Sequence, residues 1–251
     1  MKEVLYELKN KVATITLNRP LQLNALNKTA MAQLFSAWES FEKDDGALVA
    51  ILTGAGTRAF CVGRDLKEAE DGIFDLRSIP LIGSTVRVSK PTIAAVNGLA
   101  LGGGFLFAQM CDICLASELA TFSIPEARLG RGAAWAATLV NLMPPRLVME
   151  MLLTGASVSA SRLEALGFIN AVVPQDQLAS TARTMAELIA SNAPLSVRAC
   201  RSMVRESYLT TNSNITAEKA KELFAGVYES DDAQEGARAF NEKRQPIWKG
   251  C

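Results

Sequence analysis

Apolar strand segments alternate with an amphipathic helical segment at the start of the chain. Residues 11–17 alternate apolar and polar side chains and are rich in β-branched residues, which is typical of a strand. Residues 28–42 carry apolar side chains at helical spacing, and residues 47–54 form an unbroken apolar run. Strands buried on both faces have such runs, and parallel strands are joined by crossover helices. This order predicts an α/β fold built on a parallel sheet.

The same pattern recurs further along the chain. Residues 91–104 (PTIAAVNGLALGGG) predict a strand that ends in a glycine turn, and an apolar helix is expected directly after it, over 105–112. Residues 113–117 and 120–126 predict two more short strands. The repetition supports several strand-and-helix units packed around one core.

The C-terminal part has a different character. From Pro144 onward helical segments dominate, including one over 217–230, and a polar stretch over 209–214 predicts a loop between helices. We expect this part to form a cap or an assembly element. No second independent domain is required, since 251 residues with 49% hydrophobic composition can bury one large core.

The charge balance argues against nucleic acid and membrane partners. Lysine plus arginine total 26 and aspartate plus glutamate total 26, so the chain has no net positive field to attract nucleic acid or anionic lipid. Charges are interleaved through the N-terminal segment in place of the apolar stretch of a secretory signal, and no apolar run reaches transmembrane length. These features predict a cytoplasmic protein.

Histidine is absent from the sequence, while five cysteines are present. The absence of histidine removes Ser-His-Asp and Cys-His machinery together with the commonest metal ligand. Cys111 and Cys114 form a CxxC pair, a spacing that can bind zinc or do redox work. They lie in an apolar run typical of a strand, where positions three apart face opposite sides. We therefore expect no metal and no cofactor, with acid–base chemistry left to carboxylates, lysine, tyrosine, cysteine or the backbone.

Two glycine turns are candidates for binding a substrate through the backbone. One is the segment 60–66 around Gly63, and the other is Gly102-Gly103-Gly104 at the start of a helix. Glycine lets a ligand approach main-chain N–H groups closely, and the first amides of a helix carry the positive end of its dipole. Together the two turns could form an oxyanion hole. Tight packing between strand and helix is the alternative explanation for each turn.

Six segments, in this order, resemble one known family. They are NRPLQLNALN, AFCVGRDLKE, KPTIAAVNGLALGGGFLFAQMCDICLAS, FSIPEARLG, GFINAVVP and SDDAQEGARAFNEKRQPIWKG. The series is similar to the crotonase (enoyl-CoA hydratase/isomerase) superfamily over nearly the whole chain. The resemblance implies a spiral of ββα units over 1–192, followed by a helical trimerisation region over 193–251. It also implies an acyl-CoA thioester as substrate, with coenzyme A as part of that substrate, and a homotrimer or a dimer of trimers.

The resemblance further implies roles for individual residues. The backbone N–H groups of Arg64 and Gly103 would form the oxyanion hole, and Glu126 would move the proton. Residues that would contact the substrate are Ala25, Val62, Asp65, Leu66, Gly102, Leu106, Pro125, Trp135, Phe240 and Lys243. Ala25, Val62, Asp65 and Leu66 correspond to positions along the CoA groove, and Phe240 and Lys243 to positions that reach a neighbouring subunit's nucleotide. An ordinary solvated side chain is the alternative for Lys243.

One departure from the family pattern bears on the reaction. Hydratases of this family use two glutamates, and the first of these positions is Leu106 here, so only Glu126 remains. A single carboxylate can shuttle a proton from the α carbon of a 3-enoyl thioester to its γ carbon, and burial would bring its pKa toward neutrality. With Trp135 shortly after Leu129-Gly130, the pattern resembles the 3,2-enoyl-CoA isomerase branch. Core packing is the alternative for Trp135, and stabilisation of a helix N-terminus is the alternative for Glu126.

Other functions remain open on the same scaffold. A hydratase or dehydratase with one glutamate, a thioesterase or a decarboxylase would share the oxyanion hole. A non-catalytic acyl-CoA binding protein is a further alternative, because the first glutamate is missing. The acyl group depends on residues 68–88 and on Trp135, and no acyl specificity follows from the sequence.

Overall fold

The structure is a computed structural model that describes residues 2–67, 78–210, 225, 229, 231–244 and 246–247, with the side chains of 206–210 left out. It has the mixed α/β architecture that the sequence predicts. A six-stranded sheet has the order β1-β2-β3-β5-β7-β10, formed by Val4–Lys9, Val12–Leu17, Val49–Gly54, Thr92–Val96, Ile113–Ser117 and Ala171–Val173. A four-stranded sheet has the order β4-β6-β8-β9, formed by Ala59–Cys61, Leu99–Leu101, Thr121–Ser123 and Val158–Ser159.

Neighbouring strands are parallel through most of both sheets. In the larger sheet only the hairpin of β1 and β2 is antiparallel. In the smaller sheet β4, β6 and β8 run parallel and β9 is antiparallel to β8. The sequence analysis did not predict β1, which precedes the strand that it did predict.

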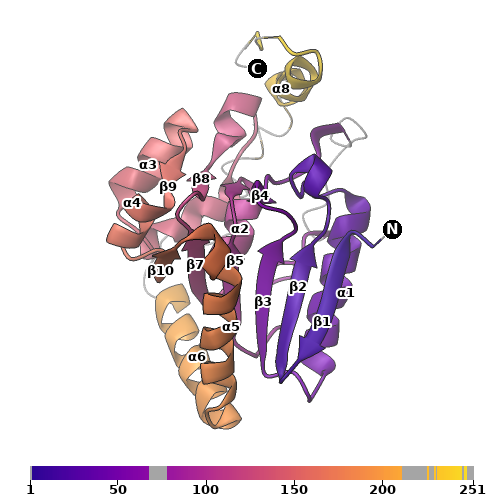
Figure 1. Ribbon diagram of the computed structural model, residues 1–251. Helices are drawn as coiled ribbons and strands as arrows, with labels where there is room; N and C mark the ends of the chain where they lie inside the picture. The colour runs from indigo at the N-terminus through magenta and orange to yellow at the C-terminus, as the bar shows by residue number, and fades with distance from the viewer. Residues whose placement is uncertain are drawn as a thin grey trace.

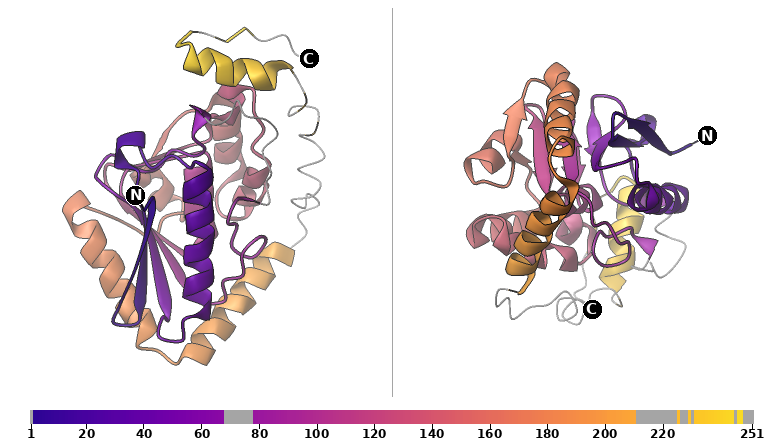
Figure 2. Two further views of the ribbon diagram at one scale, coloured as in Figure 1. Left: turned by 90° about the vertical axis from the view of Figure 1, so that its right-hand side faces the viewer. Right: turned by 90° about the horizontal axis from the view of Figure 1, so that it is seen from below.

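The larger sheet is covered on both faces, as the apolar runs of its central strands require. Helix α1 (Lys28–Lys43) packs on one face, where Leu34, Trp38 and Phe41 join the main core. Helix α5 (Leu178–Ala190) packs on the other, through Leu178, Ala182 and Ala186. Figure 1 and the left view of Figure 2 show the sheet between these two helices. The helix predicted over 28–42 is therefore confirmed as α1.

Three times the chain passes from the larger sheet directly into the smaller one. β3 leads to β4, β5 to β6, and β7 to β8, so the repeating unit contains two strands in different sheets. Asn97 and Gly98 separate β5 from β6, and the Asn97 side chain bonds the backbone of Gly54 and Gly56. The single strand predicted over 91–104 is thus wrong, because this turn divides it.

The other α-helices of the described residues are α2 (Gly103–Met110), α3 (Pro145–Thr154), α4 (Ala160–Ala165), α6 (Pro194–Thr210) and α8 (Asp231–Asn241). In the described ranges the 3-10 helices are η1 (Pro20–Gln22), η4 (Pro125–Leu129), η5 (Ala134–Asn141) and η6 (Gln175–Gln177). None of the helices in the described ranges combines the length and apolarity needed to cross a membrane.

The helices α6 and α8 lie at opposite ends of the molecule (Figures 1 and 2). Helix α6 is fixed to the body by Arg201 and Arg205, which pair with Asp112 at 2.7 and 3.0 Å. Residues 209 and 210 belong to α6, so the predicted loop over 209–214 begins too early, and its remaining positions fall outside the described residues. The helix predicted over 217–230 lies outside them except for residues 225 and 229, and of the segment 68–88 the part 68–77 lies outside them.

Candidate active site

Three short strands of the smaller sheet end beside one another. β4, β6 and β8 are parallel neighbours in that order, and the carboxyl ends of parallel strands meet at the same edge of a sheet. Gly63 follows β4, Gly102 follows β6, and Glu126 follows β8. Elements more than 20 residues apart in sequence are therefore brought together by strand pairing.

The turn after β4 lies in contact with the turn after β6. Gly63 has φ +84°, and a Cβ atom at this position would lie 3.1 Å from the backbone N of Gly103. On its other side the same turn pairs with the N-terminal segment, because Leu26 N donates to Gly63 O at 2.8 Å and Asp65 N donates to Leu26 O at 2.9 Å. The structure thus places Arg64 and Gly103 on two touching glycine turns.

Gly102 connects the helix α2 to the strand that precedes Glu126. It has φ +50°, and its N–H donates to Ser123 O, the last residue of β8, at 3.0 Å. A Cβ atom on Gly102 would lie 3.0 Å from Oε1 of Glu126. Glycine at this position therefore satisfies a positive φ and leaves room for the carboxyl group.

Glu126 belongs to a tightly fixed turn. Pro125 opens the 3-10 helix η4, and its restricted φ suits the first position of a helix. Gly130 closes the helix in a left-handed conformation, and Arg131 N donates to Glu126 O at 2.9 Å. The backbone on both sides of the glutamate is therefore held in place.

The two carboxyl oxygens of Glu126 have different surroundings. Oε1 accepts a hydrogen bond of 3.0 Å from the indole Nε1 of Trp135. Oε2 is buried and has no hydrogen-bond partner. Burial raises the pKa of Glu126 to about 7, while the hydrogen bond from Trp135 and, to a smaller extent, the nearby N–H of its own backbone act to lower that pKa. A carboxyl group with this pKa can both accept and donate a proton near neutral pH.

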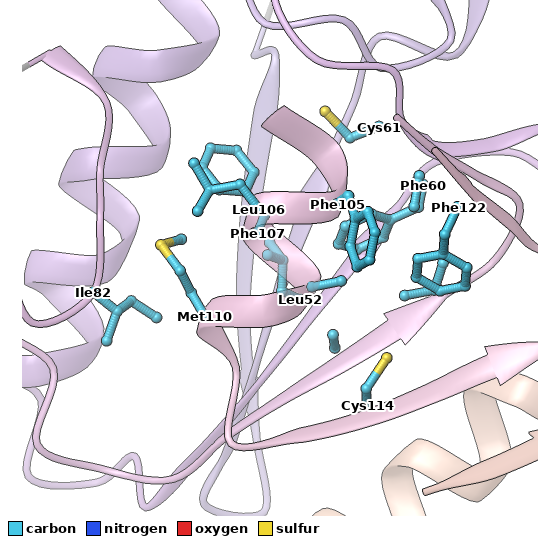
Figure 3. Close-up of a cluster of buried hydrophobic side chains, with 14 of the residues drawn as sticks. Leu52, Phe60, Cys61, Ile82, Phe105, Leu106, Phe107, Met110, Cys114 and Phe122 are labelled. Carbon is cyan, nitrogen blue, oxygen red and sulfur yellow. The ribbon is translucent and has the colours of Figure 1, made fainter. Parts of the chain in front are cut away.

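Aromatic side chains hold the indole of Trp135. Its ring lies 5.8 Å from that of Phe105, edge to face, and Phe105 packs in the same manner on Phe122 and Phe168, both at 5.2 Å. Figure 3 shows Phe105 on the side of α2 that faces Phe60 and Phe122. The sequence analysis missed the bond from Trp135 to Glu126. The sequence did carry one signal for this bond, because the N–H of a tryptophan in the core usually finds a hydrogen-bond partner.

Comparisons with known proteins identify the family. The family model described as Enoyl-CoA hydratase/isomerase matches residues 7–251. The chain belongs to this family. A probable mitochondrial enoyl-CoA hydratase of Dictyostelium discoideum is 38% identical, over 96% of this chain and 89% of that relative. The carnitinyl-CoA dehydratase of Salmonella agona is 36% identical over the whole of both chains. A solved carnitinyl-CoA hydratase from Mycobacterium avium is 34% identical, covers 100% of both chains and has a TM-score of 0.87.

These relatives bear hydratase or dehydratase names. Membership of the enoyl-CoA hydratase/isomerase family confirms the resemblance seen in the sequence. The preference for the isomerase branch is not supported by the three names, which agree better with the hydratase or dehydratase alternative.

Leu106 is the position at which this member departs from the two-glutamate pattern expected of family hydratases. It is 8% exposed and belongs to the main core. Figure 3 shows Leu106 and Met110 on the side of α2 that faces Ile82, away from Phe105. An apolar side chain therefore occupies this place, whereas the carboxyl group of Glu126 lies beside the turn at Gly102.

Other predicted substrate-binding residues lie around the first glycine turn. Asp65 is held by Arg19, whose Nη1 lies 3.0 Å from Oδ2, and the same nitrogen donates to the carbonyl of Ala25. Val62 and Leu66 flank the turn and are partly buried. The Asp65 carboxylate is therefore committed to an ion pair that joins two segments of the predicted CoA groove.

Phe240 and Lys243 lie at the C-terminal end of α8, outside the cluster of glycine turns. Phe240 is 58% exposed, and Lys243 follows the helix with φ +53°. Helix α8 itself packs on η4, since a Cβ atom on Gly236 would lie 1.8 Å from the carbonyl oxygen of Leu129. A role for Phe240 and Lys243 toward a neighbouring subunit stays a prediction.

Two further features lie away from this site. A groove of about 820 Å³ runs between α6 and the end of α2, with Gln109, Asp112, Phe168 and Arg201 in its wall, and none of the predicted site residues lines it.

The two cysteines of the CxxC pair also lie away from the site. Cys111 ends α2 and Cys114 lies in β7, and both are free thiols whose pKa burial raises. Within the described part of the chain, no group of three or more metal-binding side chains is found.

Proposed function

We propose that the chain catalyses the reversible elimination of water from a 3-hydroxyacyl-CoA thioester, with Glu126 as the side chain that carries the proton. The observation that carries this proposal is a buried carboxyl group with a pKa of about 7 beside two touching glycine turns. The hydratase and dehydratase names of the relatives support this type of reaction, in which water is added to or eliminated from an acyl-CoA. The acyl-CoA substrate class follows from the family.

The proposed reaction needs one proton carrier and two backbone donors. The N–H groups of Arg64 and Gly103 bind the thioester oxygen and stabilise the negative charge that develops on it. The carboxylate of Glu126 takes the proton from the α carbon, which produces an enolate. The enolate re-forms the carbonyl and expels the 3-hydroxyl, which leaves as water with the proton from Glu126. Hydration is the same sequence in reverse, and neither direction requires a metal or a separate cofactor.

Isomerisation of a 3-enoyl thioester is the second candidate function. It is favoured by one observation, the buried apolar Leu106 at the position of the first hydratase glutamate. Glu126 would remove the α proton and return it to the γ carbon, so no water would need to be held. A lone carboxyl group of this pKa suits either reaction.

Substrate assays separate the candidates. Purified protein is offered 3-hydroxybutyryl-CoA, crotonyl-CoA and a 3-enoyl-CoA, and the absorbance of the conjugated enoyl thioester is followed. The proposal predicts gain of conjugation from the first and loss from the second. If conjugation is gained from the 3-enoyl-CoA and the other two substrates do not react, the protein is an isomerase and the proposal is wrong. Release of free CoA thiol, measured in parallel, would indicate a thioesterase.

Substitution of Glu126 tests the enzyme against a non-catalytic binder. Glu126→Gln should lower kcat at least about 100-fold, because general acid–base catalysis by one side chain contributes about that much. Glu118→Gln, at an exposed position, is the matched control and should retain activity. A wild-type protein that binds acyl-CoA and turns over none of the substrates would instead be a binding protein.

Assembly is a separate proposal. We propose that residues 193–251 mediate a homotrimer or a dimer of trimers, on the basis of the family resemblance. Light scattering coupled to gel filtration would give the mass of the particle. A monomer of 26.9 kDa at micromolar concentration would contradict this proposal.

A further inference from the structure

We propose that Trp135 is a positioning residue that holds Oε1 of Glu126 and so makes Oε2 the oxygen that exchanges the proton with the substrate. This inference rests on the proposed function of Glu126. It differs from the sequence prediction, in which Trp135 contacts the substrate and helps to decide which acyl group is accepted.

The first step of the argument is the asymmetry of the carboxyl group. Oε1 accepts the indole hydrogen bond at 3.0 Å and faces Gly102, whereas Oε2 is buried without a partner. A buried acceptor without a hydrogen bond is unfavourable unless another group, such as a ligand, satisfies it. Oε2 is therefore the oxygen whose hydrogen-bonding capacity is available to a substrate.

The second step concerns what an indole can do. Its Nε1–H donates and cannot accept, so the oxygen bound to Trp135 is occupied in both protonation states of Glu126. The proton of the neutral carboxylic acid accordingly resides on Oε2. The same oxygen then takes the proton from the α carbon and returns it to the leaving group.

The third step is the rigidity of the donor. Trp135 lies on η5 and Glu126 on η4, so the bond joins two separate elements. The indole cannot easily turn away, because Phe105 lies against it and is itself packed on Phe122 and Phe168. The direction of the Glu126 side chain thus depends on an aromatic cluster around α2.

Three charged side chains on the elements packed around Glu126 have partners other than Glu126. On η4, Arg128 donates to Thr154 O; on α3, Glu150 pairs with Arg162; and on α8, Glu235 pairs with Arg238 and Arg244. In the described part of the chain, burial and hydrogen bonds, rather than a charged neighbour, set the pKa of Glu126. The pH dependence of activity should therefore report directly on the indole hydrogen bond.

Trp135→Phe removes the donor and keeps an aromatic ring against Phe105. Because a hydrogen bond to the charged form favours ionisation, its loss should raise the kinetic pKa in kcat/KM by about 1 and lower kcat by roughly 10-fold or more. Trp38→Phe is the matched control. Trp38 is fully buried, packs on Phe41, and its Nε1 has no partner. This control should keep the wild-type pH midpoint.

A measurement on the wild-type protein tests the same inference in case Trp135→Phe fails to fold. The three tryptophans are labelled with nitrogen-15, and their indole resonances are assigned with Trp38→Phe and Trp248→Phe. The Trp135 resonance should titrate with the midpoint of kcat/KM, and this titration should vanish in Glu126→Gln.

Two results would overturn the inference: a Trp135 resonance that does not respond to pH, or a Trp135→Phe enzyme with the wild-type pH midpoint. In either case an inactive Glu126→Gln enzyme would leave the proposed function standing. An active Glu126→Gln enzyme would instead refute the proposed function itself. The two failures are therefore distinguishable.

Discussion

The indole Nε1 of Trp135 donates a hydrogen bond of 3.0 Å to Oε1 of Glu126, although the two residues lie on different 3-10 helices. This bond lowers the pKa of a carboxyl group whose burial raises it, and burial has the larger effect. The result is a buried acid with a pKa of about 7. Such a group should influence the stability of the fold as well as its chemistry.

Glu126 should make the fold less stable as pH rises. Between its ordinary pKa of 4.5 and the folded value of about 7, the unfolded chain loses the proton while the folded chain keeps it, so the free energy of unfolding falls with pH and levels off above about 7. The full effect on the free energy of unfolding is roughly 3 to 4 kcal/mol, since one pKa unit corresponds to about 1.4 kcal/mol. Urea denaturation of Glu126→Gln should therefore show a stability advantage over wild type that grows from pH 5 to pH 8. An advantage that stays constant, as expected for Glu118→Gln, would contradict the raised pKa.

Gly63→Ala should impair catalysis more than folding. The new Cβ would lie 3.0 Å from Leu101 O and 3.1 Å from Gly103 N, beside one proposed oxyanion donor. Loss of one such donor typically lowers kcat about 100- to 1,000-fold. Gly167→Ala is the control, because Gly167 has nearly the same φ, +83°, and nothing within 4 Å of an added Cβ. If kcat falls equally in both variants, backbone strain alone would explain the loss and the prediction would be wrong.

Gly236→Ala should disturb both α8 and the turn that carries Glu126. The added Cβ would lie 1.8 Å from Leu129 O, so the helix must move away from η4. Overpacking of this kind costs about 1–3 kcal/mol, and kcat should fall as the glutamate turn loses its support. Gln234→Ala, on the exposed side of α8, should have neither effect. A wild-type melting temperature in Gly236→Ala would show that α8 does not pack here in solution.

Asp112→Ala should weaken the attachment of α6. Asp112 accepts bonds from Arg201, Arg205 and Thr92, and the ion-paired side chains are 9–17% exposed. Removal of one partner from a buried pair leaves uncompensated charge and typically costs about 3–5 kcal/mol. Glu150→Ala breaks an ion pair whose side chains are half-exposed, so solvent screening should make its effect far smaller. Urea denaturation would measure both variants, and an equal loss of stability in the two would contradict this prediction.

The sequence analysis located the segments of the site and missed some of their connections. The glycine turns at Gly63 and Gly102 and the carboxylate at Glu126 all follow short strands of one sheet in the structure. The division of residues 91–104 into β5 and β6 was not foreseen, because it depends on Asn97 bonding a turn about 40 residues earlier in the chain.

The sequence by itself determined the types of the elements and the kind of chemistry available. Periodicity within about ten residues specifies α1 and the buried strands, and the absence of histidine leaves carboxylates as the main proton carriers. Only the tertiary structure decided that Oε1 of Glu126 faces Trp135 and Gly102, and that burial raises its pKa. Local patterns reflect nearest neighbours along the chain, whereas desolvation and hydrogen-bond distance depend on segments that meet only when the strands pair.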